Sequence, residues 1–174
     1  MEYANSTRFG MFAAAHILWS LVCAWPVMRL LGKLELWLPT ACAAGMMLAY
    51  LPLGWVIARF GRWPLPHGSQ HRWAVLLPAG IAWVWAGCTA LFLYIDHDVA
   101  IAAALGLPAF LLASPSLLFI ECFMQCIGRL LESGDMMAWL AAAIFFAGLL
   151  PPLLFHLGAC LGSRKGLALE DDLT

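Results

Sequence analysis

Polar side chains inside long apolar runs are the residues of this sequence that could do chemistry. His16 and His156 are the first pair, each within a hydrophobic run. An ionisable group at membrane depth is costly unless it is paired, so such groups often mark a ligand or a transport path. If both chain ends lie on one side of a membrane, the two imidazoles have similar depth and could bind a haem or a metal ion, or relay protons. The alternative is that each donates one hydrogen bond to a neighbouring carbonyl group and stabilises helix packing.

A second candidate site is the sequence Glu-Cys-Phe-Met-Gln-Cys at residues 121–126. Cys122 and Cys126 are one helical turn apart and therefore share a helix face. Thiolate and thioether ligands select soft cations such as Cu(I) or Zn²⁺, and Glu121 and Gln125 would add oxygen ligands. No Cys-x-x-Cys and no adjacent histidine accompany them, and buried cysteines also serve as small apolar side chains. The segment predicts either a soft-metal site or inert thiols beside a carboxylate.

A third cluster contains the two acidic residues Asp96 and Asp98. The carboxylate of Asp98 can accept hydrogen bonds from the free amides of a helix that begins at Val99. Both negative charges also favour the positive end of that helix dipole. The pattern therefore predicts a helix start, and the alternative is a gate for a cation or a solute.

Basic and aromatic residues gather between residues 59 and 73, where three arginines stand with two histidines and two tryptophans. Contact with anionic lipid headgroups explains this composition. A docking surface for a partner protein is the alternative. Either reading makes Arg59, Arg62 and Arg72 the contact residues.

The elements that position these residues are long and apolar. The chain has 174 residues, 64% hydrophobic and 11% charged, whereas about a quarter of the residues are charged in soluble domains. The net charge of −1 provides no basic field for nucleic acid and so excludes nucleic-acid binding. About 20 apolar residues cross a bilayer as a helix. Four runs meet this length and predict transmembrane helices at 9–28, 38–58, 73–95 and 136–161.

The region 99–131 differs because it is too long for one upright span and contains Pro108 and a Ser-Pro-Ser sequence at 114–116. Proline removes a backbone donor and restricts its predecessor, so helices end or kink there. The two pieces, 99–113 and 116–131, would each reach only about 24 Å as helices. We therefore predict a re-entrant helical hairpin or two short tilted spans. The predicted fold class is an all-α, polytopic transmembrane bundle with four full spans and this broken pair.

Basic residues indicate the orientation of the chain, because Lys and Arg accumulate in short cytoplasmic loops. With a single span in 99–131 they divide five to four, which shows no bias. With a hairpin there, three basic residues oppose six on the side of the termini, namely Arg8, Arg59, Arg62, Arg72, Arg164 and Lys165. We therefore predict an integral protein of the cell membrane with both termini in the cytoplasm.

The broken region 99–131 also indicates which function to expect. The sequence has no Gly-rich phosphate loop, no Gly-x-Ser-x-Gly and no His-Glu-x-x-His, which disfavours catalysis. Irregular backbone at membrane depth is tolerated where it is buried in protein or lines a cavity, and broken helices recur at solute and ion sites. We predict a transport-type subunit that binds or conducts a small solute or ion, with a path along Ser114, Ser116, Glu121, Gln125, Asp96 and Asp98.

Two alternative functions stay open. One is a haem- or metal-binding anchor of an electron-transfer complex, which would use His16, His156, Cys122 and Cys126. The other is an accessory or assembly protein that acts through its helix faces and the arginine-rich loop. Because the chain is small, we also predict a homo-oligomeric or hetero-oligomeric membrane partner in addition to the lipid bilayer.

Overall fold

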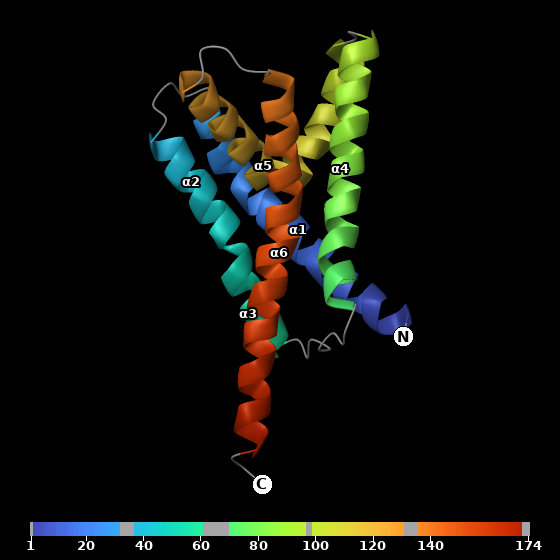
Figure 1. Ribbon diagram of the computed structural model, residues 1–174, viewed down its shortest axis with the longest axis vertical. Coiled ribbons are helices and arrows are strands. Elements are labelled where there is room, and N and C mark those ends of the chain that lie inside the picture. The colour runs from blue at the N-terminus through green and yellow to red at the C-terminus, as the bar shows by residue number, and fades with distance from the viewer. Residues whose placement is uncertain (1, 32–36, 61–69, 97–98, 131–135, 172–174) are drawn as a thin grey trace.

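A computed structural model gives the protein as a bundle of α-helices (Figure 1). The structure describes residues 2–31, 37–60, 70–96, 99–130 and 136–171. Side chains are described for 7–31, 37–60, 72–87, 111–128 and 137–163. Six helices cover the described residues. The predicted all-α fold class is confirmed.

The first two spans are α1 (Glu2–Leu30) and the pair α2 (Trp37–Leu48) and α3 (Tyr50–Phe60). The helix pair runs on across Ala49, whose amide donates to the Gly45 carbonyl at 3.0 Å. Pro52 has no amide hydrogen, so the regular hydrogen bond to the carbonyl four residues earlier is absent at this break. The predicted span 38–58 is therefore one apolar crossing built from two helices in succession.

Two further helices run the length of the bundle, namely α4 (Gln70–Asp96) and α6 (Met136–Asp171) (Figure 1). Four stretches of the described residues are long and apolar enough to cross a membrane. They are Thr7–Leu30, Trp37–Phe60, Leu111–Gly128 and Met137–Ser163. Helix α4 covers the predicted span 73–95 with 27 residues, which is also sufficient length for a crossing. The chain is an integral membrane protein.

Helix α5 (Val99–Leu130) is broken at Ala113, where φ is −136° and ψ is 26°. The cause lies two residues later, because Pro115 has no amide hydrogen and its ring displaces the preceding turn. Both outer ends of α5 lie at the end of the bundle opposite the chain termini, and the break lies inside the bundle (Figure 1). The helix therefore begins and ends at one end of the bundle, as expected for the predicted broken pair, whether it is a re-entrant hairpin or two short tilted spans.

Glycines allow very close contact between α3 and α6. A Cβ atom added at Gly54 would overlap the carbonyl oxygen of Phe155, and one added at Gly158 would overlap that of Leu51. One turn beyond, a Cβ atom at Gly162 would lie 2.6 Å from the Trp55 carbonyl oxygen. Lipid gives no hydrophobic driving force between helices, so such small residues associate them through backbone contact. We call this contact the glycine seam.

The helix faces that point away from the bundle carry exposed apolar side chains. On α1, the exposed fraction of Leu18, Val22 and Trp25 is about two thirds. Trp73, Ile81 and Val84 are comparably exposed on α4. In a bilayer these faces meet hydrocarbon at no cost, so they agree with the membrane assignment.

Candidate functional site

A buried histidine–tyrosine pair lies beside the break in α5. The Tyr50 hydroxyl oxygen is 2.7 Å from Nδ1 of His16, and the Tyr50 side chain is fully buried. The imidazole also stacks on Phe12, with 5.5 Å between ring centroids. Helix α1 thus supplies the imidazole and α3 the phenol, so the pair couples the first span to the second.

The same imidazole reaches the broken helix, since it also faces the backbone carbonyl of Leu112. Carbonyl groups at a helix end lack an intrahelical partner and take one from elsewhere. A neutral imidazole has one donor and one acceptor nitrogen. With Nε2–H directed to the Leu112 carbonyl, Nδ1 is the acceptor and Tyr50 the donor. His16 therefore joins the tyrosine to the end of the first half of α5.

Two serines complete the site. Ser114 donates to the backbone carbonyl of Ser20 at 2.8 Å, and both serine side chains are fully buried. The Ser20 hydroxyl faces Tyr50, yet no described residue completes a hydrogen bond with it. A buried polar group left without a partner costs about 1–3 kcal/mol. We call His16, Ser20, Tyr50 and Ser114 the break-site cluster.

Hydroxyl, phenol and imidazole groups in succession can pass a proton. Each of the three groups in Ser20, Tyr50 and His16 can both donate and accept a hydrogen bond. The unsatisfied Ser20 hydroxyl offers an oxygen to a water molecule or a small cation. The cluster therefore contains the types of group that proton relay or weak cation binding would need.

The second serine of the Ser-Pro-Ser sequence holds α5 to α6. Ser116 donates to the Ala147 carbonyl at 3.1 Å. Ala147 lies four residues before Pro151, which has no amide hydrogen, so this carbonyl loses its normal helical donor. Within a membrane a freed carbonyl has to find another donor. Ser114 and Ser116, both predicted to line a path, are thus bonded to the backbone of neighbouring helices.

We expect Ser116→Ala to lower the free energy of unfolding by about 1–3 kcal/mol, because the buried Ala147 carbonyl loses its donor. In the Pro151→Ala variant, the amide of residue 151 can donate to the Ala147 carbonyl. Ser116→Ala is then expected to lower the free energy of unfolding much less. Unfolding in mixed detergent, followed by tryptophan fluorescence, measures both. Equal losses in the two backgrounds would show that the proline does not create the need for Ser116.

The other four residues of the predicted path do not belong to the break-site cluster. Two lie farther along α5, and the side chains of the other two are not described. Gln125 donates to Glu121 at 3.0 Å, and these residues lie about three and two helical turns beyond Ser114. Both side chains are half-buried. Asp96 ends α4 without a described side chain, and Asp98 lies outside the described residues. The proposed roles of these four residues stay predictions.

The thiols of α5 pack where three helices meet. Cys122 is buried with Cys23 of α1 and Leu118, and Cys42 of α2 packs against them. Cys126 is half-buried one turn later. Among the residues whose side chains are described, no three His, Cys, Asp or Glu side chains gather closely enough to hold a metal ion. The described thiols occupy a position typical of small apolar side chains.

The two histidines have different surroundings. His156 is buried on α6, with Nε2 3.6 Å from the Cys160 sulfur one turn away. The Phe12 ring that stacks on His16 meets the ring of Phe155 edge-on at 5.3 Å. Because Nδ1 of His16 already pairs with Tyr50, a haem or metal bound through Nδ1 would have to displace that bond. Coordination by this histidine pair remains a prediction.

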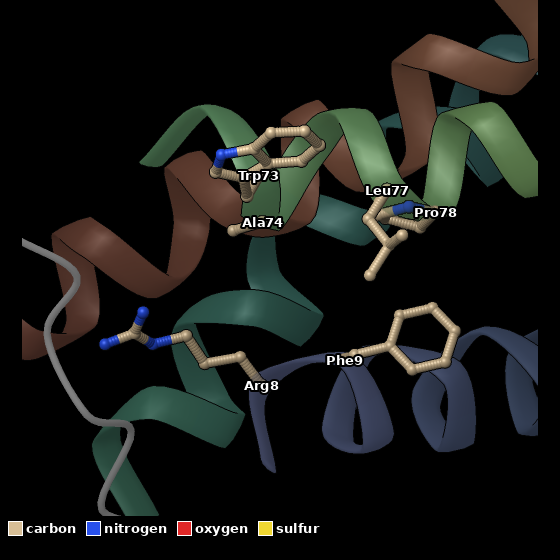
Figure 2. Close-up of a pocket in the computed structure, with 6 residues that line it drawn as sticks. All are labelled: Arg8, Phe9, Trp73, Ala74, Leu77 and Pro78. Atoms are coloured by element: carbon tan, nitrogen blue, oxygen red, sulfur yellow. The ribbon is translucent and has the colours of Figure 1, made fainter. Parts of the chain in front are cut away.

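The arginines predicted to contact lipid or a partner lie near the chain termini. Arg59 and Arg72 are exposed, near the ends of α3 and α4 that share one end of the bundle with the start of α1 (Figure 1). Arg62 lies outside the described residues. At this end a cavity opens between α1 and α4, lined partly by Arg8 and Trp73 (Figure 2). From the sequence, Arg8 was expected only as one of the basic residues near the termini, and this cavity was not predicted.

Comparison with known proteins gives no match. No family model matches the sequence, and no curated protein or solved structure matches it.

Proposed function

We propose that the protein is a transport-type membrane subunit that conducts a proton or a small cation through the break-site cluster. The observation that carries this proposal is the His16–Tyr50 pair beside the break in α5. Polar groups at membrane depth are retained where they serve a pathway. Broken helices present free backbone carbonyls to ions at the same depth.

The unsatisfied Ser20 hydroxyl supports the same function. The hydroxyl groups of Ser114 and Ser116 each donate to a backbone carbonyl of a neighbouring helix. Ser20 instead faces the phenol without completing a bond to any described residue. A transported water, proton or cation passing the cluster would use such an oxygen transiently.

The proposed orientation places the termini in the cytoplasm. Helix α1 begins and α6 ends at one end of the bundle (Figure 1). Arg8, Arg59 and Arg72 belong to helix segments at this end, and Lys and Arg accumulate on the cytoplasmic side. The mouth of the re-entrant helix would then face the opposite side of the membrane.

The test is ion flux into liposomes that contain the purified protein. A potassium gradient with valinomycin sets the membrane potential, and an enclosed pH dye or cation dye reports the flux. We expect a flux above that of protein-free liposomes. Ser20→Ala is expected to reduce it to the protein-free level, while the free energy of unfolding stays the same or rises because an unsatisfied polar group is removed.

Ser163→Ala is the matched control. Its hydroxyl donates to the Ala159 carbonyl of its own helix at 2.8 Å and lies outside the cluster, so its removal is expected to leave the flux unchanged. No flux from the folded wild-type protein with either protons or monovalent cations would contradict the proposal. A Ser20→Ala variant that conducts like the wild type would contradict the assigned path.

A further inference from the structure

A cavity of about 170 Å³ lies between Arg8 and Phe9 of α1 and the beginning of α4 (Figure 2). Its lining residues are Arg8, Phe9, Trp73, Ala74, Leu77 and Pro78. It lies at the end of the bundle where the chain begins, away from the break-site cluster.

The two ends of this cavity differ in chemistry. The guanidinium group of Arg8 and the indole nitrogen of Trp73 both lie toward one end (Figure 2). Phe9, Leu77 and Pro78 form the other end with hydrocarbon alone. A ligand that fits both ends has a charged or polar head and an apolar chain.

The polar end favours an anion with hydrogen-bond acceptors. Arg8 carries a permanent positive charge, and its side chain is only 4% exposed. A guanidinium group binds phosphate oxygens in a fork of parallel hydrogen bonds. The indole N–H of Trp73 is a donor without acceptor capacity. Both groups therefore match a phosphate.

A backbone carbonyl freed by Pro78 provides a hydrogen-bond acceptor in the lining of the cavity. Pro78 lies four residues after Ala74 in α4 and has no amide hydrogen. The regular helical hydrogen bond to the Ala74 carbonyl is therefore missing. That carbonyl can accept a hydrogen bond from a headgroup hydroxyl.

The open side of the cavity indicates that the apolar chain belongs to a membrane lipid. The exposed fractions of Trp73 and Leu77 are 62% and 47%, and the exposed face of α4 meets hydrocarbon. A tryptophan at a span end lies at the headgroup level of the bilayer. A molecule can therefore enter sideways from the bilayer, with its head at the depth of Arg8.

We propose that this cavity binds one anionic phospholipid such as phosphatidylglycerol. The phosphate accepts hydrogen bonds from Arg8 and Trp73, and the beginning of one acyl chain lies along Phe9 and Leu77. This site is independent of the proposed ion path, because none of its residues belongs to the break-site cluster.

The test is lipid binding to the delipidated full-length protein in detergent, measured by native mass spectrometry. We expect dioleoylphosphatidylglycerol to bind in preference to dioleoylphosphatidylcholine. Arg8→Gln is expected to weaken this binding roughly tenfold or more, as the loss of a charged hydrogen bond implies. Arg8→Lys is expected to retain part of the affinity, because it keeps the charge and loses the fork.

The chain offers a matched control at the other end of α1. Arg29 lies over the ring of Trp25, 5.6 Å from its centroid, but neither residue lines the cavity. Arg29→Gln removes the same charge and is expected to leave the affinity unchanged. An equal loss from Arg29→Gln would overturn the site, because it would show only attraction between net charges.

A second variant approaches the cavity from α4, so the test does not depend on the folding of the Arg8 variants. Leu77→Trp fills the apolar end and is expected to remove the bound lipid while the melting temperature stays near that of the wild type. Wild-type lipid binding by both Arg8→Gln and Leu77→Trp would overturn the proposal. Displacement of the lipid by millimolar inorganic phosphate would also overturn it, because it would assign a simple anion site.

Discussion

Gly158→Ala is expected to lower the free energy of unfolding by about 3 kcal/mol, at the upper end of the range for overpacking. The added Cβ atom would overlap the Leu51 carbonyl oxygen, and neither backbone can yield without separating α3 from α6. Gly54→Ala is expected to have a comparable effect through the Phe155 carbonyl oxygen. Both losses are large relative to the usual effect of adding one methyl group.

Unfolding in mixed detergent, followed by tryptophan fluorescence, measures these losses. Gly45→Ala is the matched control, because a Cβ atom there meets nothing within 4 Å. This change is expected to be neutral or slightly stabilising, since alanine favours helix more than glycine does. If Gly158→Ala and Gly45→Ala behaved alike, the seam would not hold the two helices together.

The spans were predictable because they depend on composition along the chain. A run of apolar residues long enough to cross a bilayer has one stable conformation there, so the helices at 9–28 and 136–161 followed from length alone. The helix contacts did not follow in the same way. Gly54 was one of many small residues in the apolar runs. Only the structure shows that it contacts the Phe155 carbonyl of α6 while Gly158 of α6 contacts the Leu51 carbonyl of α3.

The break in α5 was also predictable, since proline acts on its own helix through local sterics. The groups that contact this break were not predictable, because they belong to other helices. Ser114, which was predicted to line a path, donates to the Ser20 carbonyl of α1, and the sequence alone does not identify this partner. Tyr50 and Ser20 were polar residues inside apolar runs, so the argument applied to His16 would also have singled them out.

The carbonyl groups that Pro151 and Pro78 leave without a helical donor have different surroundings. Ser116 of α5 supplies the donor for Ala147, which Pro151 leaves without one. At the beginning of α4, the carbonyl freed by Pro78 belongs to the lining of the cavity. In a bilayer such a carbonyl takes its donor from a neighbouring helix or from a ligand. The first proline therefore fixes packing, and the second is part of a proposed binding site.

Tyr50→Ala is expected to lower the free energy of unfolding by about 3–5 kcal/mol, the range for removing a buried aromatic ring. The ring is fully buried and lies 5.6 Å from the His16 ring, centroid to centroid. Tyr50→Phe retains that contact and removes only the hydroxyl. It is expected to cost about 1–3 kcal/mol, because Nδ1 of His16 then loses its hydrogen bond.

A double-mutant cycle separates the hydrogen bond from the packing. His16→Leu and Tyr50→Phe are each expected to destabilise, but the double variant should be less destabilised than the sum of the two. The difference is expected to be about 1 kcal/mol, and the same unfolding measurement gives it. Additive losses would mean that the hydrogen bond between Tyr50 and His16 contributes no stability. Only the flux measurement would then test the role of the pair. The proposed path predicts that Tyr50→Phe also removes the flux, whereas a purely structural bond would leave the flux of the folded variant unchanged.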